Sequence, residues 1–394
     1  MLNLRLDLIS KTKGILAAEE YFNILPPTAK DRLTCEALLN CYCKELMEDK
    51  ALAMFKKMGE SNFLSSDFPF NNLMSLYMRL NQPEKVPLLV QEMKRRSISL
   101  GTFTYNIWMK SYASLNDIEG VERVMTEDES KFDWTKYSNL AAIYVKARLF
   151  EKAESALKKL EEVMKPPKRE AFHCMISLYA GTSNLDEVNR VWNSLKSTFP
   201  KVNNMSYLAM LEALRRLKGG GVDSLTKCYE EWESNCSSYD VRLANVAISV
   251  YLSQDMFEEA SLVFYTAIKR CRGPFFAARE SFMVYFLKTH QLDLALSHLE
   301  AAVSEVKDNE WRPTPATRTV FLKYFEAEKD VDGAEKFCSV LKTFDSLTSN
   351  VYHLLLKTYI AAGKSAPKIC QRLKEDHIEI SSDLEKLLER VCPN

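Results

Sequence analysis

The segment Thr102–Asp133, TFTYNIWMKSYASLNDIEGVERVMTEDESKFD, predicts two short helices joined by a tight turn. The first helix places apolar residues at i, i+3, i+4 and i+7, which form one face of an α-helix: Tyr105, Trp108, Met109 and Tyr112. The run Ser114–Asp117 supplies turn and cap residues, and the second helix has its apolar side at Ile118, Val121, Val124 and Met125. A pair this short cannot bury its apolar face alone, so it needs neighbouring pairs.

The same pattern recurs along the chain. The units are aligned on a tyrosine near the end of the first helix, which is replaced by Leu214, Phe286 and Phe325 in three units. They begin at Arg32, Asp67, Thr102, Trp134, Arg169, Asn204, Val241, Phe276, Pro315 and Ser349. Successive starts are 35, 35, 32, 35, 35, 37, 35, 39 and 34 residues apart, a regularity that chance would not produce. The sequence therefore predicts an all-α solenoid of helix-turn-helix repeats. We expect a partial N-terminal repeat in residues 1–31, nine repeats in residues 32–348, and a last repeat with a C-terminal capping helix in residues 349–394.

Composition excludes several other classes of protein. The chain has 394 residues but only 11 Gly and 13 Pro, which argues against long loops and β-rich folds. No apolar run approaches the roughly 18 residues of a membrane span, so no membrane contact is expected. With 53 basic and 53 acidic residues, the chain has no net charge to bind nucleic acid over its whole surface. Neutrality still allows a basic stripe on one face.

The sequence predicts no catalytic residue, no metal site, no cofactor and no small-molecule substrate. His377 and Glu379 match the H-x-E half of a deaminase motif, but only Cys392 follows where P-C-x-x-C is needed. The run Lys218–Val222 contains three glycines and is interpreted as a lengthened turn, since no G-K-[S/T] follows. The ten cysteines have no metal-ligand spacing, and the helical tyrosines and tryptophans are expected in the core rather than as base-stacking platforms.

The units resemble pentatricopeptide repeats of the plain, 35-residue type. The resemblance is carried by T-Y-N-x-x-[aromatic]-x-x-x-Y in the first helix and by EDKALAMFKKM, EKAESALKKL, FEEASLVF and VDGAEKF in second helices. It covers essentially the whole chain and implies a right-handed superhelix that binds RNA. The tetratricopeptide pattern W-x-x-L-G-x-x-Y is absent.

Further segments resemble a plant subgroup of this family, namely RLDLISKTKG, LLNCYCKELM, FDWTKYSNLAAIYV and AAGKSAPKICQRLKE. Members of that subgroup are mitochondrial, and some are components of the large subunit of the plant mitochondrial ribosome. The resemblance therefore implies a place in the mitochondrial matrix. The chain itself begins within a repeat and displays no signal or transit peptide.

The resemblance also implies that the fifth and last residues of each unit read one base. The polar candidates for this function are Asn71, Asn106, Asp133, His173, Asn203 and Asn245. Only Asn106 with Asp133 forms a standard pair, one that would favour uracil, whereas Glu36, Leu208 and Glu280 at position five do not fit. A base-by-base reader of a long transcript is therefore not expected.

Positions five, nine and thirteen of the first helix lie four residues apart and share one face. Over ten units they include three acidic residues, Glu36, Glu212 and Glu280, and eight basic residues, where composition predicts about four of each. The basic residues are Lys44, Arg79, Lys110, Lys146, Arg216, Lys288, Lys323 and Lys357. This phosphate stripe predicts a surface that binds an RNA backbone by charge, with little base reading.

We interpret the chain as a non-catalytic RNA-binding protein and a structural component of the plant mitochondrial ribosome, with ribosomal RNA and mitochondrial ribosomal proteins as partners. One alternative is a free organellar factor that binds a single-stranded transcript for processing, stability or translation, which predicts a run of good code pairs. The other is a protein-binding scaffold, which predicts no excess of basic residues on the stripe.

Overall fold

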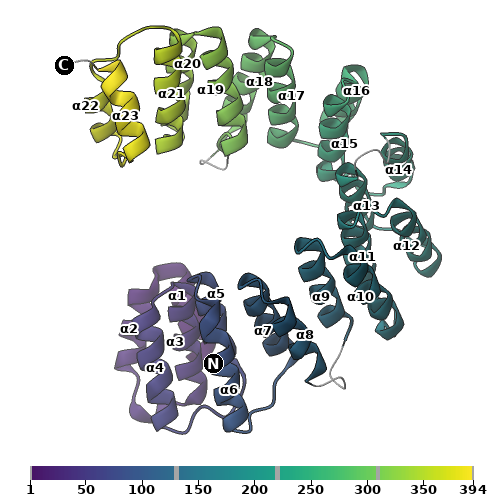
Figure 1. The fold of residues 1–394 in the computed structure, drawn as a ribbon, viewed down its shortest axis with the longest axis vertical. Coiled ribbons are helices and arrows are strands. Elements are labelled where there is room, and N and C mark those ends of the chain that lie inside the picture. Colours follow the sequence, from purple (N-terminus) through teal and green to yellow (C-terminus); the bar gives the residue numbers. More distant parts are fainter. Residues whose placement is uncertain (1, 128–132, 218–221, 308–310, 393–394) are drawn as a thin grey trace. The chain divides into compact units, whose positions relative to one another are not determined.

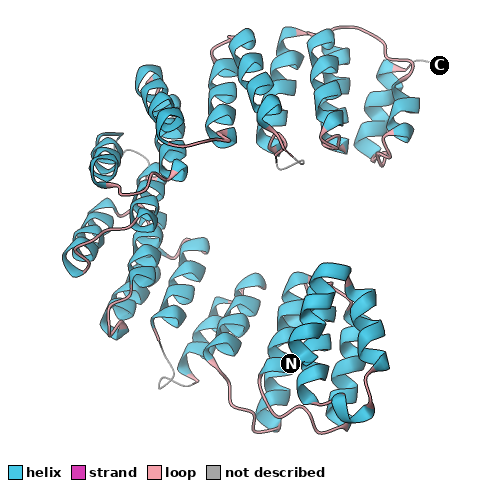
Figure 2. Ribbon diagram, turned by 180° about the vertical axis from the view of Figure 1, so that it is seen from behind, coloured by secondary structure: helices cyan, strands magenta, loops and turns pink. Residues whose placement is uncertain are grey.

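The computed structural model describes residues 2–127, 133–217, 222–307 and 311–392. Over these ranges all regular structure is helical, with 23 α-helices, two short 3₁₀ helices and no strand (Figures 1 and 2). The helices form two compact units, residues 1–201 and 202–394. The predicted all-α repeat fold is confirmed, while its division into partial, regular and capping repeats stays a prediction. No helix of the described ranges is long and apolar enough to cross a membrane.

The first unit contains α1 (Leu2–Lys13), α2 (Ile15–Ile24), α3 (Arg32–Lys44), α4 (Glu48–Glu60), α5 (Phe68–Arg79), α6 (Val86–Arg95), α7 (Thr102–Ser114), α8 (Ile118–Thr126), α9 (Trp134–Lys146), α10 (Phe150–Val163), α11 (Arg169–Gly181) and α12 (Leu185–Thr198). The second contains α13 (Asn204–Arg216), α14 (Val222–Asn235), α15 (Val241–Ser253), α16 (Phe257–Arg270), α17 (Phe276–Lys288), α18 (Leu292–Glu305), α19 (Pro315–Glu328), α20 (Val331–Thr343), α21 (Ser349–Ala361), α22 (Ile369–Glu375) and α23 (Ser382–Val391).

Odd-numbered helices up to α21 are the first helices of the repeats, which we call helix A, and even-numbered helices are the second, helix B. From α3 onward, every described helix A begins at its predicted unit start except α5, which begins one residue later at Phe68. Consecutive A helices pack against one another within each unit, from α1 to α11 and from α13 to α21 (Figure 1). From α2 to α20, each helix B packs on its own helix A, so within each unit the A helices form a layer and the B helices cover its back.

The turn from helix A to helix B repeats one backbone motif. Residue fifteen of the unit has a left-handed conformation, with φ between 56° and 66°, at Leu46, Asn81, Asn116, Arg148, Ser183, Asp255, His290, Lys329 and Gly363. The next N–H then donates back to the carbonyl of residue eleven, as from Asp117 to Tyr112 at 2.9 Å. This closes helix A by the 6→1 bond of a Schellman turn. The predicted turn at Lys218–Val222 falls largely on residues 218–221, outside the described ranges.

The recurring aromatic residue near the end of helix A is buried in most repeats and can also connect neighbouring repeats. Tyr144 is buried, and its hydroxyl donates to Oε1 of Glu122 on the preceding helix B at 3.1 Å. Lys152, on the helix B of the same repeat, bonds that oxygen at 2.7 Å, and its ammonium lies over the tyrosine ring. Matching lysine–glutamate pairs lie beside two other helix A tyrosines, Lys50–Glu19 by Tyr42 and Lys85–Glu48 by Tyr77. The prediction that the helix A tyrosines and tryptophans are core residues is confirmed for Tyr42, Tyr77, Tyr105, Trp108 and Tyr144. Tyr112 and Tyr359 are only half-buried.

Candidate nucleic-acid interface

The phosphate stripe lies on helix A throughout. In the first unit its residues are Lys44 on α3, Arg79 on α5, Lys110 on α7 and Lys146 on α9. In the second they are Arg216 on α13, Lys288 on α17, Lys323 on α19 and Lys357 on α21. All are exposed except Lys357, which is half-buried. Because the A helices pack side by side, these residues form a row along the exposed face of the helix A layer within each unit, which we call the helix A face.

Two stripe residues have partners in a neighbouring repeat that the sequence did not reveal, and Arg216 donates to the Glu212 carbonyl at 3.2 Å within α13. The ammonium of Lys44 pairs with Oδ1 of Asp7 on α1 at 3.0 Å. The Arg79 guanidinium donates to the carbonyls of Cys43 and Lys44 at 3.0 and 2.7 Å, so it caps the C-terminal end of α3. Lys11 and Lys44 hold the pKa of Asp7 below its ordinary value by bonding its carboxylate. These two cations therefore stabilise contacts between neighbouring repeats.

Four stripe lysines differ from this pair. Lys110, Lys146, Lys288 and Lys323 are exposed, and none forms an ion pair with another residue of the described ranges. An ammonium without a protein partner can exchange its counterions for a phosphate, which gives sequence-independent attraction to nucleic acid. These four are therefore the stripe residues best placed to contact an RNA backbone.

The last residue of a repeat is the N-cap of the next helix A. Oδ1 of Asp133 accepts from the backbone N–H groups of Thr135 and Lys136 at 3.1 and 3.2 Å at the start of α9. Oδ1 of Asn203 accepts from the backbone N–H of Ser206 at 2.9 Å at the start of α13. Asp, Asn, Ser and Thr are the preferred N-cap residues, because their side chains satisfy the free N–H groups of the first turn. Capping alone thus accounts for these residue types, whether or not they also read a base.

Position five has two kinds of environment. The amide of Asn71 is engaged at both ends, since Nδ2 donates to Asp67 at 3.1 Å and Oδ1 accepts from Thr104 at 2.8 Å. The Oδ1 atoms of Asn106 and Asn245, by contrast, are buried and have no hydrogen-bond partner among the described residues. A buried carbonyl without a partner is costly, so both amides are open to a water or a ligand. His173 is half-buried, and burial lowers its pKa. The six base-code residues stay predictions.

Sequence reasoning missed a row of apolar side chains at position two. Leu33, Phe68 and Phe103, spaced by 35 residues, are 48%, 45% and 57% exposed in the first turns of α3, α5 and α7. Position two lies three residues before position five and on the same side of the helix. Exposed aromatic and apolar surface of this kind can stack on unpaired bases. The sequence did contain a signal for this row, because an apolar residue recurs at position two, on the side of helix A that faces solvent.

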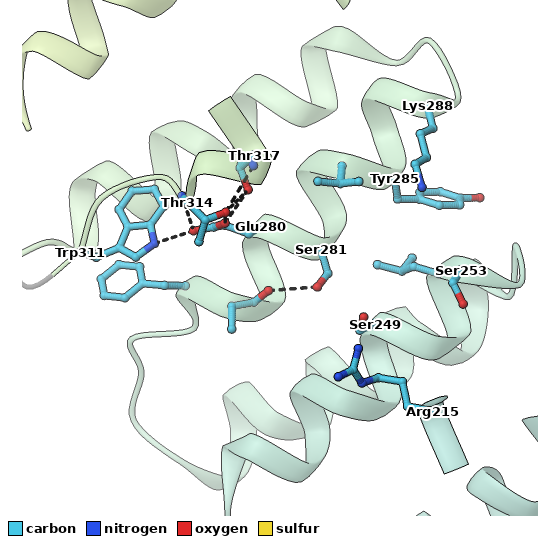
Figure 3. A pocket seen from close by; sticks show the side chains of 14 residues that line it. Arg215, Ser249, Ser253, Glu280, Ser281, Tyr285, Lys288, Trp311, Thr314 and Thr317 are labelled. Atoms are coloured by element: carbon cyan, nitrogen blue, oxygen red, sulfur yellow. Dashed lines mark hydrogen bonds between the residues drawn. The ribbon is translucent and has the colours of Figure 1, made fainter. Parts of the chain in front are cut away.

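The second unit has a cavity of about 820 Å³ on its helix A face (Figure 3). Arg215, Ser249 and Ser253 line one side, from α13 and α15, and Tyr285 and Lys288 line the other, from α17. At the far end, Trp311, Thr314 and Thr317 gather around Glu280 and are bonded to its carboxylate (Figure 3). The cavity thus combines two cations, a carboxylate and several hydroxyls with the aromatic rings of Phe276, Tyr285 and Trp311.

Family models and sequence relatives both identify similarity to pentatricopeptide repeat proteins. The PPR repeat family model matches residues 66–114, and a model of the PPR repeat matches residues 34–63 and 103–127. The Arabidopsis thaliana pentatricopeptide repeat-containing protein At1g02370, mitochondrial, is 51% identical over 395 residues, which cover 98% of this chain and 73% of that protein. The large ribosomal subunit protein mL101 (rPPR4) of the same plant is 40% identical over 398 residues, covering 98% of this chain and 80% of its own.

Among solved structures, the chain resembles the maize pentatricopeptide repeat protein PPR10 in complex with an 18-nt psaJ RNA element. The TM-score is 0.61 at 16% sequence identity, and the match covers 84% of this chain and 48% of that one. The chain therefore spans about half the length of that solved protein. At this level of identity the likeness concerns the fold.

Proposed function

Since the chain belongs to the pentatricopeptide repeat family, we propose that it is a non-catalytic RNA-binding component of the plant mitochondrial ribosome. Its partners are ribosomal RNA and neighbouring ribosomal proteins in the mitochondrial matrix. The observation that carries this proposal is the row of exposed, unpaired lysines on the helix A face, beside base-code positions that are largely engaged within the protein.

The lysine row supports contact with an RNA backbone. Lys110 and Lys146 in the first unit, and Lys288 and Lys323 in the second, are exposed and form no ion pair with the residues that the structure describes. Phosphate contacts of this kind set affinity and position but read no sequence. PPR10, which has the same fold, was solved in complex with an 18-nt RNA element, which supports RNA as the ligand of this fold.

The state of position five favours one fixed RNA over the reading of a long transcript. Glu36 accepts from Arg32 and Ser66, and burial raises its pKa, while Asn71 and Glu280 are likewise bonded to their own repeats. Side chains that are already satisfied gain little from meeting a base edge. A ribosomal component needs a shaped basic surface and few base contacts. The 40% identity with mL101, named as a large ribosomal subunit protein, supports the same conclusion.

Two features support the alternatives. The exposed Leu33, Phe68 and Phe103, with the open amide of Asn106 nearby in sequence, favour stacking of a few single-stranded bases in the first unit, as a free organellar factor would need. On the B side, α16 exposes Leu262, Tyr265 and Ile268, an apolar stripe suited to a protein neighbour. A ribosomal component accommodates both features, since it meets unpaired RNA and other proteins together.

Sedimentation of the tagged protein from mitochondrial lysate tests the proposal. It is run at low and high salt, with and without RNase. We expect co-migration with the large ribosomal subunit that survives high salt. Light fractions that shift after RNase would instead indicate a transcript-binding factor, and light fractions indifferent to RNase would indicate a protein scaffold.

A further inference from the structure

Trp311 lies against the two residues of its repeat that the family's code assigns to base reading. These are Glu280, the fifth residue of the unit that begins at Phe276, and Thr314, the last. The indole N–H donates to Oε1 of Glu280 at 2.9 Å (Figure 3). The indole ring is stacked on the Phe276 ring, with centroids 5.0 Å apart and planes inclined by 12°. A flat bicyclic ring that is stacked on one face and donates from its edge makes the contacts of a bound nucleobase.

The carboxylate of Glu280 is saturated by the protein. Oε1 also accepts from the Thr314 backbone N–H at 3.4 Å, and Oε2 accepts from the hydroxyls of Thr314 and Thr317 at 2.6 and 2.5 Å. The residue is 8% exposed. Thr314 is also the N-cap of α19, bonded to the N–H of Thr317 at 3.3 Å. A base entering here would have to displace the indole and would meet a carboxylate whose oxygens are already in use.

The repeat that contains Trp311 is longer than the other repeats. The unit is the longest in the array, with 39 residues to the next start where most units have 35. The extra residues lie between α18 and α19, the stretch that contains Trp311. Lys288, at position thirteen of the same helix A, remains exposed and forms no ion pair within the described ranges. The unit therefore keeps an exposed cation that a phosphate could contact, while Trp311 lies over Glu280 at position five.

We propose that Trp311 occupies the nucleobase position of this repeat, so that RNA crosses the repeat on its backbone alone. This inference rests on the proposed RNA-binding function. The repeat beginning at Phe276 acts as a spacer that positions phosphate through Lys288 and takes no base. When an RNA strand binds to the second unit, one of its nucleotides lies on this repeat without having its base recognised.

Replacing the indole tests the inference without RNA. In Trp311→Ala the vacated place should bind adenosine or free indole, which restores stacking on Phe276 and a donor to Glu280. We expect either compound to raise the Tm of Trp311→Ala with a concentration dependence that saturates, and to leave the wild-type Tm unchanged. The double variant Phe276→Ala with Trp311→Ala should lose this response. An equal Tm shift in the wild type, or none in Trp311→Ala, would overturn the inference.

Crosslinking provides a second test, and its wild-type measurement does not depend on the folding of a variant. The probe is a single-stranded RNA of mixed sequence that contains 4-thiouridine, and crosslinked peptides are mapped by mass spectrometry. We expect no crosslink to Phe276, Trp311 or Thr314, and a new crosslink there in Trp311→Phe, whose smaller ring leaves room. A crosslink to Trp311 in the wild type would contradict the proposal. If the wild type binds no RNA, the proposed function fails, while the adenosine experiment still decides whether Trp311 fills a base-shaped site.

Discussion

Asp133 shows how one residue can serve two functions. Its Oδ1 is held by the first turn of α9, through two backbone N–H groups and by the Thr135 hydroxyl at 2.6 Å. The side chain is exposed. As an N-cap it stabilises a helix, and as the last residue of its repeat it is the expected partner of Asn106 in reading uracil. The two functions require different chemistry, because several residue types can cap but the code pair needs the carboxylate.

Substitution of Asp133 separates these functions. Asp133→Ala removes the cap and should lower the free energy of unfolding by about 0.5–2 kcal/mol. Asp133→Ser retains a capping hydroxyl and should be close to the parent in stability. If Asp133 also reads a base, the Ser variant should lose any preference for oligo(U) over oligo(A). Chemical denaturation and binding to the two oligomers measure both effects, and an Ala variant as stable as the parent would refute the capping argument.

His298 provides a pH-dependent contribution to stability. It lies on α18 among the rings of Phe264, Phe282 and Phe286, at centroid distances between 5.0 and 6.1 Å. Burial, with a smaller effect of Arg279, lowers its pKa from 6.5 to about 4. The unfolded chain therefore takes up a proton below pH 6.5 that the folded protein refuses until about pH 4.

The stabilising contribution of neutral His298 is complete above pH 6.5 and is lost progressively as the pH falls towards 4. We expect His298→Leu to have a flatter dependence of Tm on pH across this window than the parent. The exposed His377, replaced by Asn, is the matched control and should leave the slope unchanged. Thermal unfolding at pH values from neutral to mildly acidic checks this, and identical slopes for parent and His298→Leu would exclude the assignment.

At the scale of the element, the recurring feature is a residue with a left-handed backbone conformation at the end of helix A. Only one of the nine described instances is glycine, Gly363. The others include Arg148, with φ of 59°, which is exposed. A residue with a Cβ carries strain of roughly 1–2 kcal/mol in this conformation, whereas glycine carries none. The repeats thus store small strains in their turns, which the packing of helix B on helix A outweighs.

Arg148→Gly should therefore stabilise the protein by up to about 1 kcal/mol, since part of the relieved strain is offset by the greater chain entropy of glycine. Arg148→Val should destabilise it, because a β-branched side chain fits this conformation worst. Thermal unfolding of both variants measures the difference. A Gly variant with a lower Tm than the Val variant would contradict the turn argument.

At the scale of the whole molecule, the relevant property is the distribution of charge. The chain has 53 basic and 53 acidic residues, so an excess on one face must be balanced elsewhere. Several of the other charges are paired between neighbouring B helices, as in Arg190 with Glu161 at 2.9 Å. The helix A face keeps four exposed lysines that form no ion pair among the described residues. Binding to RNA should therefore depend on salt as a row of phosphate contacts does, despite the neutral total.

Reversal of the four unpaired stripe lysines, Lys110, Lys146, Lys288 and Lys323, to Glu should weaken binding to a single-stranded RNA at every sequence tested. The slope of log K against log salt should shrink by about 0.7 for each phosphate that is no longer neutralised, between about 50 and 200 mM salt. The matched control reverses four exposed lysines on B helices, Lys56, Lys158, Lys227 and Lys336, with the same change in net charge. Fluorescence anisotropy measures both, and equal weakening by the two sets would assign the effect to net charge alone.

The period of 35 residues, the helix pairs and the start of nearly every helix A followed from the amino-acid sequence alone. They depend on apolar spacing, turns and caps within a few residues of one another, as in Tyr105–Tyr112 and Ser114–Asp117. Only the tertiary structure decided which site residues are available. The amide of Asn71 is engaged by Thr104, the guanidinium of Arg79 by the end of α3, and the carboxylate of Glu280 by Trp311 and Thr317. Each of these contacts joins residues about one repeat apart, and no local pattern encodes which side chains meet when neighbouring helix pairs stack.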